Sequence, residues 1–282
     1  MKKITRRSFM AAAGLTVAAL ALTACGGSSS TASSAAASSV ASSAAASSEA
    51  ASAAATELTT VEAGKLTMAT NAAFPPYEMT TDAGEFEGID IETAQAIADK
   101  LGLELQIDDM DFDAALLSVQ QGKADIVMAG VTVTDERKAV MDFSDSYATG
   151  IQSIIVPNDS DIASPDDLAG KKIGTQRGTT GYIYCSDDFG EDSVVAYDSG
   201  LTAVQALNNG QVDAVVIDNA PATEYVAANP GLKVLDTSYA EEDYAIGMAK
   251  GSALEDAVNK ALEELKADGT LQAIVDKYIT AE

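Results

Sequence analysis

Histidine and tryptophan are absent from this 282-residue sequence, and cysteine occurs only twice, as Cys25 and Cys185. The lack of histidine excludes histidine-based acid–base catalysis, triads that contain histidine, and histidine metal sites. Two cysteines cannot form a cysteine-rich metal site. We therefore expect no metal site and no bound cofactor. We expect Cys185 to be a small buried residue rather than a redox group.

Basic residues are scarce. The sequence has 17 Lys and Arg against 43 Asp and Glu, a formal net charge of −26. Nucleic-acid binding needs a basic face, so we expect no nucleic-acid partner. With 47% hydrophobic and 21% charged residues, the chain can form the core of one or two globular domains.

The N-terminus has the profile of an export signal. Four basic residues in the first seven precede the apolar segment 9–24, which is too short to span a membrane comfortably. Leu22 to Cys25 resembles a bacterial lipobox. This resemblance implies that residues 1–24 are a lipoprotein signal peptide and that Cys25 carries acyl groups such as palmitate. Residues 5–10 also resemble a twin-arginine signal, but we favour the general secretory route.

Residues 25–60 are almost only Ser, Ala, Thr and Gly after the cysteine. Such a segment has too few groups to bury to offset its ordering entropy. We predict a Ser/Ala-rich flexible tether that holds the folded part off a membrane. A structural stalk is the alternative, and it changes nothing about the next part.

From Lys65 the composition is that of a globular protein, with strand and helix patterns in alternation. This alternation indicates an α/β fold with parallel strands. The patterns predict strands at 66–70, 103–107, 124–129, 151–156, 171–176, 214–217 and 244–249, and helices at 89–101, 113–121, 165–168, 252–265 and 271–279.

The segment 122–147 has the features of an anion site. Its apolar run stops at Gly130, where no side chain keeps a ligand from the backbone. Thr132 follows, and Thr134 is a good N-cap for a helix that has Arg137 in its first turn, near free backbone N–H groups. Hydroxyl, helix start and guanidinium together suit a carboxylate. A capped surface helix with a solvated arginine fits the local sequence equally well.

A second candidate follows the strand 171–176. The sequence Gly178-Thr179-Thr180 again offers backbone N–H groups and hydroxyls to an anion. An ordinary turn with an N-cap is the alternative.

Residues 121–127 are echoed by residues 209–215, and this register sets Gly130 against Asp218. Both would lie at carboxyl ends of strands, where open α/β sheets bind ligands. A carboxylate that faces an arginine across a cleft would complement an α-amino acid. Asp218 could also cap the helix that starts near Pro221.

Taken together, the motifs resemble the family 3 extracellular solute-binding proteins, the polar-amino-acid receptors of ABC importers. The motifs are Phe74–Glu78, Gly88–Ile91, Ala129–Arg137, Asp142–Tyr147, Gly178–Thr180, Gly210–Asp218 and Lys266–Thr270. The resemblance implies a two-lobed type II periplasmic-binding-protein fold with two crossover hinge strands, near 149–151 and 244–246. Lobe 1 would be 61–148 and 247–282, and lobe 2 would be 149–246.

The resemblance also implies roles for the two charged groups of the site. Arg137 would hold the substrate α-carboxylate with help from Thr132, Thr179 and Thr180. Asp218 would accept the α-ammonium, together with the Gly130 carbonyl and the Thr132 hydroxyl.

By the same resemblance, Phe74 and Phe112 would sandwich the substrate side chain, although each could be a core phenylalanine. Asn71 and Gln176 would face its far end. Many relatives have Asp where this chain has Asn71, which favours a neutral polar substrate similar to glutamine or cystine over a cationic one.

The implied function is transport. We expect a monomeric, extracytoplasmic, lipid-anchored protein that captures an amino acid and delivers it to an ABC permease and its ATPase. One alternative is an enzyme on the same scaffold, such as the family's dehydratase relatives, but the site has no histidine and no positioned acid–base pair. A ligand sensor without transport is the other alternative.

Overall fold

The computed structural model describes residues 58–279, all within one compact unit. The predicted signal peptide, the lipidation site Cys25 and the tether up to residue 57 lie outside the described residues.

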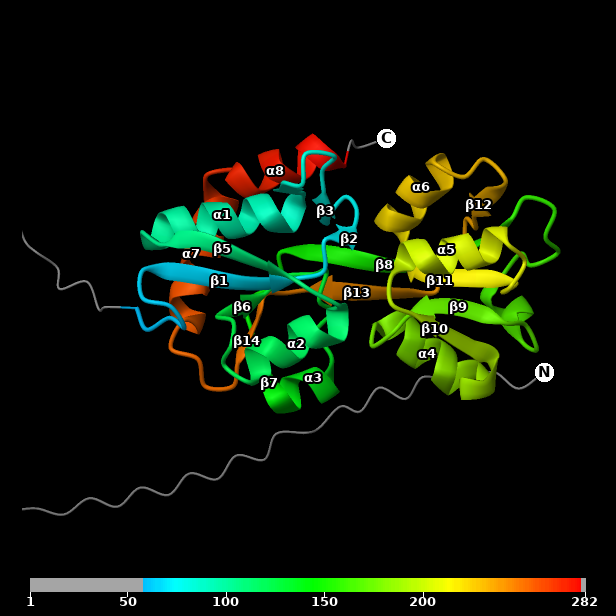
Figure 1. The fold of residues 1–282 in the computed structure, drawn as a ribbon, viewed down its shortest axis with the longest axis horizontal. Coiled ribbons are helices and arrows are strands. Elements are labelled where there is room, and N and C mark those ends of the chain that lie inside the picture. The colour runs from blue at the N-terminus through cyan, green and yellow to red at the C-terminus, as the bar shows by residue number, and fades with distance from the viewer. Residues whose placement is uncertain (1–57, 280–282) are drawn as a thin grey trace, which may run out of the picture. The chain divides into compact units, whose positions relative to one another are not determined.

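The first of two large sheets has parallel strands at its centre. Its order is β5 (Glu104–Asp109), β1 (Lys65–Thr70), β6 (Ile126–Val127), β14 (Gly247–Ala249) and β7 (Met141–Phe143). Strand β1 is parallel to β5 and β6, whereas β14 is antiparallel to β6 and β7. Figure 1 shows this sheet with α1 (Ile89–Leu101) and α8 (Thr270–Tyr278) on one side, and α2 (Phe112–Gln120) and α3 (Asp135–Val140) on the other.

Alternation along these strands divides their side chains between two core clusters. Met68 and Ile126 pack with α1, α8 and α7 (Glu255–Ala267), whereas Ala69 and Val127 pack with α2. Successive side chains of a strand point to opposite faces, so the apolar run in each strand serves both layers of helices.

The second sheet is built in the same way. Its order is β10 (Val194–Tyr197), β9 (Ile173–Gln176), β11 (Ala214–Asp218), β8 (Ala148–Pro157) and β12 (Leu232–Val234), and β13 (Ala240–Tyr244) also pairs with β8. The helices are α4 (Thr180–Phe189), α5 (Gly200–Asn208) and α6 (Asn219–Ala227), with 3-10 turns at Pro165–Leu168 and Glu191–Ser193. Cys185 on α4 is buried, and burial raises the pKa of its thiol to about 12. The expected burial of this residue is confirmed.

Two chain segments connect the sheets. Strand β8 follows β7 of the first sheet, and β13 precedes β14 of the first sheet. The strands β8 and β13 are antiparallel, with Ala148 opposite Tyr244, and Figure 1 shows them running side by side between the two sheets. The predicted α/β class is therefore confirmed. The exact residue boundaries of two lobes stay a prediction.

Two strand predictions are wrong in detail. The segment 244–249 is not one strand, because the chain passes from one sheet to the other at residues 245–246. The predicted strand 124–129 is reduced to Ile126–Val127, although the backbone N–H groups of Asp125 and Met128 still donate to Thr67 and Ala69 of β1. The Asp125 carboxylate accepts the backbone N–H groups of Val61 (2.7 Å) and Thr67 (2.8 Å).

A small three-stranded sheet of β2 (Ala73–Phe74), β3 (Glu78–Thr80) and β4 (Phe86–Glu87) leads into α1. The chain enters the helix at Gly88, whose φ is +131°. A Cβ atom at this position would lie 2.2 Å from the carbonyl oxygen of Tyr77. Only glycine permits this close approach, which brings Glu78 next to the first turn of α1 and its residue Asp90.

We predict that Gly88→Ala lowers the free energy of unfolding by more than about 2 kcal/mol, because it adds a backbone clash to an unfavourable φ. Gly84→Ala is the matched control: its φ is +81°, but nothing lies within 4 Å of the added Cβ. Gly84→Ala should lower the free energy of unfolding by only about 1 kcal/mol. Urea unfolding of both variants measures the difference, and equal losses would show that the Tyr77 contact is unimportant.

Candidate functional site

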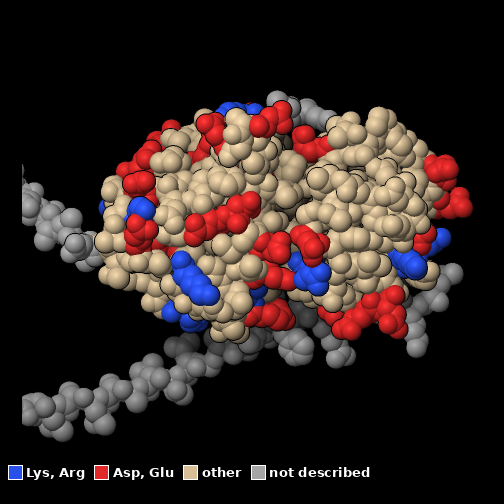
Figure 2. Space-filling view, viewed as in Figure 1, with Lys and Arg blue, Asp and Glu red and all other residues tan. Residues whose placement is uncertain are grey.

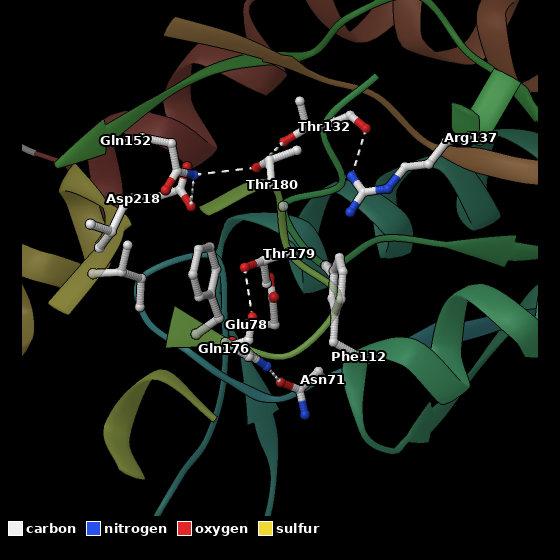
Figure 3. Close-up of a pocket in the computed structure, with 15 residues that line it drawn as sticks. Asn71, Glu78, Phe112, Thr132, Arg137, Gln152, Gln176, Thr179, Thr180 and Asp218 are labelled. Atoms are coloured by element: carbon white, nitrogen blue, oxygen red, sulfur yellow. Dashed lines mark hydrogen bonds between the residues drawn. The ribbon is translucent and has the colours of Figure 1, made fainter. Parts of the chain in front are cut away.

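One pocket collects all ten predicted site residues between elements of the two sheets (Figure 3). The space between the protein atoms of this pocket amounts to about 430 Å³, and this volume includes a part that is open to solvent. The lining residues are Asn71, Phe74, Glu78, Phe112, Ala129, Gly130, Thr132, Arg137, Gln152, Gln176, Thr179, Thr180, Val216, Ile217 and Asp218.

The fold places these residues together because parallel strands end at the same edge of a sheet. Asn71 follows β1 and Gly130 follows β6 in the first sheet. Gln176 ends β9 and Asp218 ends β11 in the second sheet. The pocket therefore lies at the carboxyl ends of parallel strands from both sheets, as expected for α/β folds.

Arg137 is held in the pocket by the start of α3. Its backbone N–H donates to the side chain of Thr134 (3.1 Å), which confirms the predicted N-cap. The guanidinium, expected near free N–H groups, instead contacts two carbonyl oxygens. Nη1 donates to Thr132 (2.7 Å) and Nη2 donates to Gly178 (3.1 Å), and the Phe112 ring lies 5.4 Å away.

The surroundings of this guanidinium suit an anion. Arg137 is only 8% exposed, and no carboxylate of residues 58–279 lies within 4 Å of it. Burial lowers its pKa, and the more distant charge of Glu242 acts against that shift. An arginine remains charged in proteins, so this is a buried cation that donates to two carbonyl oxygens and lies over the Phe112 ring.

Asp218 supplies the opposite charge. Its side chain accepts the Tyr244 hydroxyl and the Gln152 amide (2.8 Å). It occupies the N-cap position of α6 but makes no capping bond, so the cap alternative does not describe its side chain. Burial raises the pKa of Asp218 to about 7, with a further rise from Glu242, while the bonds from Tyr244 and Gln152 act in the other direction.

The two threonines that follow β9 both line the pocket, and Thr179 is also the N-cap of a helix. Thr179 caps α4 by accepting the N–H of Tyr182 (3.3 Å), and it also lines the pocket. The Thr180 hydroxyl donates to Glu242 (3.0 Å).

Sequence reasoning missed Glu242 and Gln152. One oxygen of Glu242 accepts hydrogen bonds from Thr132 (3.1 Å), Gln152 (3.0 Å) and Thr180 (3.0 Å). A weak signal for Gln152 was its polar side chain in a mostly apolar strand, and the structure places it opposite Asp218 in the sheet register. Glu242 carried no signal in the local pattern.

The other end of the pocket is lined by amides and aromatic rings. The Gln176 amide donates to the Asn71 side chain (2.9 Å), which in turn donates to the Met110 carbonyl (2.8 Å). Phe74 stacks on Tyr77 with ring centroids 5.9 Å apart. Phe74 and Phe112 belong to the hydrophobic clusters and also line the pocket, so each is part of the core and exposed to the pocket at once.

Within residues 58–279, no three His, Cys, Asp or Glu side chains are grouped to hold a metal ion. The same residues include no helix with the length and apolar character needed to cross a bilayer. Figure 2 shows acidic side chains in scattered patches on the visible face and basic side chains in fewer places, in keeping with the net charge.

Comparison with known proteins agrees with this architecture. The model of the bacterial extracellular solute-binding proteins, family 3, matches residues 66–281. The L-cystine-binding protein TcyJ of Escherichia coli K12 is 33% identical over 225 residues, covering 78% of this chain and 85% of the relative. The arginine-binding extracellular protein ArtP of Bacillus subtilis is 34% identical over 223 residues, covering 77% and 87%.

Among solved structures, the arginine-, lysine-, histidine-binding protein ArtJ of Geobacillus stearothermophilus superimposes with a TM-score of 0.74 at 34% identity. The match covers 77% of this chain and 96% of ArtJ. The expected two-lobed periplasmic-binding-protein fold of type II is thereby confirmed. The names of these relatives describe binding proteins, and none describes an enzyme. The chain is therefore a member of the bacterial extracellular solute-binding proteins, family 3.

Proposed function

We propose that this protein captures a free α-amino acid outside the cytoplasm for an ABC importer. Like the relatives named above, it is a binding protein and not an enzyme. The observation that supports the proposal most strongly is that two buried groups of opposite charge line one pocket without forming an ion pair with each other. Arg137 has no carboxylate partner within 4 Å among residues 58–279, and Asp218 lines the same pocket.

These two groups match the two ends of a zwitterion. A guanidinium offers a fork of donors that fits a carboxylate through two parallel hydrogen bonds. The backbone N–H groups of Thr179 and Thr180 at the start of α4 would add further donors. On the other side, Asp218, the Gly130 carbonyl and the Thr132 hydroxyl would accept the α-ammonium.

The substrate side chain would extend toward Asn71 and Gln176, between Phe74 and Phe112. The acidic residues that line the pocket are Glu78 and Asp218, and the groups assigned to the side-chain end, Asn71 and Gln176, are amides. A neutral polar side chain, similar to glutamine or cystine, suits amides better than a cationic one. TcyJ is named for cystine, whereas ArtP and ArtJ are named for cationic amino acids, so a cationic substrate is the alternative outcome to test.

We further propose that Cys25 is lipidated and that residues 25–60 tether a monomeric binding unit to the outer face of the cell membrane. There it would deliver its substrate to a permease and the associated ATPase. This arrangement keeps the captured amino acid close to the importer, because a short flexible tether gives a high effective concentration.

Loss of Arg137 should abolish most of the binding. In a thermal-shift screen over the amino acids, a true substrate at 100 times its dissociation constant should add about 2.7 kcal/mol of stability. Arg137→Ala should weaken binding by about 100-fold or more, because it removes a charge-assisted pair of bonds. Arg177→Ala is the matched control, since Arg177 pairs with Asp198 at the surface. Unchanged affinity in Arg137→Ala would remove this residue from the site.

The second prediction concerns Asn71. Asn71→Asp places a negative charge at the side-chain end of the pocket, so the screen should shift toward lysine and arginine by about tenfold in relative affinity. Asn208→Asp serves as control, because it adds the same charge at an exposed position on α5. An unchanged ranking of amino acids in Asn71→Asp would refute the role of Asn71.

The third prediction concerns pH. Asp218 must be ionised to hold an ammonium group, and its pKa in the free protein is raised to about 7. Binding therefore expels a proton below this pH. Affinity should fall as pH decreases from 7 toward 5, by up to about tenfold per unit, and should level off above about 8. Calorimetric titrations at several pH values measure this dependence. Asp218→Asn should bind weakly and lose most of the slope, and a steep slope in that variant would assign the proton to another group.

A further inference from the structure

Glu78 is a pocket residue that the proposed contacts do not use. It is fully buried at the start of β3, directly after the loop that contains Tyr77. Neither of its carboxyl oxygens accepts a hydrogen bond from an N–H or hydroxyl group of residues 58–279. An ionised carboxylate in this position would be costly, because a buried charge needs partners.

The carboxyl of Glu78 interacts instead with the carboxyl of Asp90, which is also fully buried. Asp90 already accepts two hydrogen bonds, from the Gly130 backbone N–H (3.0 Å) and from the Tyr147 hydroxyl (2.7 Å). Two carboxylates cannot hydrogen bond to each other unless one of them keeps a proton. Since the Gly130 N–H and the Tyr147 hydroxyl both donate to Asp90, a proton shared by the two carboxyls would be donated by Glu78.

The surroundings favour the same assignment. Asp218 and Asp109 add negative charge near Glu78, and the Tyr77 hydroxyl is also close. Burial, followed by the charge of Asp90, raises the pKa of Glu78 well above its ordinary range. Burial also raises the pKa of Asp90, but only to about 6. A proton shared by this pair therefore belongs on Glu78 at neutral pH.

We propose that Glu78 is a buried neutral carboxylic acid that donates its proton to Asp90, and that this pair positions the Gly130 turn in the pocket. The glycine has a φ of +54°, and a Cβ atom there would lie 2.9 Å from the Phe74 ring. The Gly130 backbone thus lies close to the Phe74 ring in a conformation that favours glycine. The hydrogen bond from its N–H to Asp90 fixes this turn. The consequence for binding rests on the proposed function, because Gly130 is expected to contact the substrate ammonium.

A neutral Glu78 also controls the charge of the site. It lines the pocket together with Asp218 but adds no second negative charge there. The positive charge of a bound ammonium is then directed to Asp218, while Glu78 acts as a positioning residue.

Infrared spectroscopy of the unliganded protein tests the protonation state. At about pH 8, wild type should show the C=O stretch of a protonated carboxylic acid, and Glu78→Gln should lack it. Wild type labelled with carboxyl-¹³C glutamate should show the band at lower frequency, which assigns it to a Glu even if the variant does not fold. Asp218→Asn should keep the band. The proposal is overturned if wild type has no glutamic-acid band at this pH. This arm uses no amino acid, so it stands apart from the proposed function.

Binding of the best amino acid from the screen tests the positioning role. Glu78→Gln keeps a donor toward Asp90 and should retain affinity within about threefold, whereas Glu78→Leu removes the donor and should lose about tenfold or more. Asp90→Asn should behave like Glu78→Leu, because one amide oxygen cannot accept all three donors. If Glu78→Gln loses as much affinity as Glu78→Leu, an ionised Glu78 is required and the proposal is wrong.

Discussion

The interaction on which the site depends is that of the Arg137 guanidinium with two backbone carbonyls. Thr132 belongs to the loop after β6, and Gly178 belongs to the turn after β9, so the guanidinium joins segments of both sheets. Burial of a cation is expensive, and carbonyl dipoles compensate it only in part. A substrate carboxylate would complete this compensation and would be held where the two sheets meet.

The opposite side of the pocket has the reverse imbalance. Burial raises the pKa of Asp218, and the charge of Glu242 raises it further. Their hydrogen bonds come from neutral groups such as the Gln152 amide. An ammonium ion would relieve this repulsion, so binding and protonation should be coupled in this fold. The same rule of pairing buried charges therefore explains both ends of the substrate.

Local patterns predicted the elements and the candidate anion-binding and acidic positions of the pocket, whereas Asn71, Phe74, Phe112 and Gln176 were assigned through the family resemblance. Helix α1 and the Thr134 cap follow from periodicity and capping rules, and the positions of Gly130 and Asp218 follow from strand ends and the echo between the two halves. Glu242 was not predictable, because its partners Thr132 and Thr180 are 110 and 62 residues away. The Asp125 carboxylate accepts the N–H of Thr67, 58 residues earlier in the chain, which is likewise a tertiary effect. Side chains that act through long-range contacts leave no periodic signal in the sequence.

The most direct test compares one bound amino acid with two of its own derivatives on the unmodified protein. The α-amide lacks the negative charge that Arg137 would hold, and the analogue without the amino group lacks the positive charge that Asp218 would hold. Calorimetry should show that each derivative binds about 100-fold more weakly than the parent amino acid, because each leaves one buried charge unpaired. Binding of either derivative as tightly as the parent would contradict a site built to clamp a zwitterion.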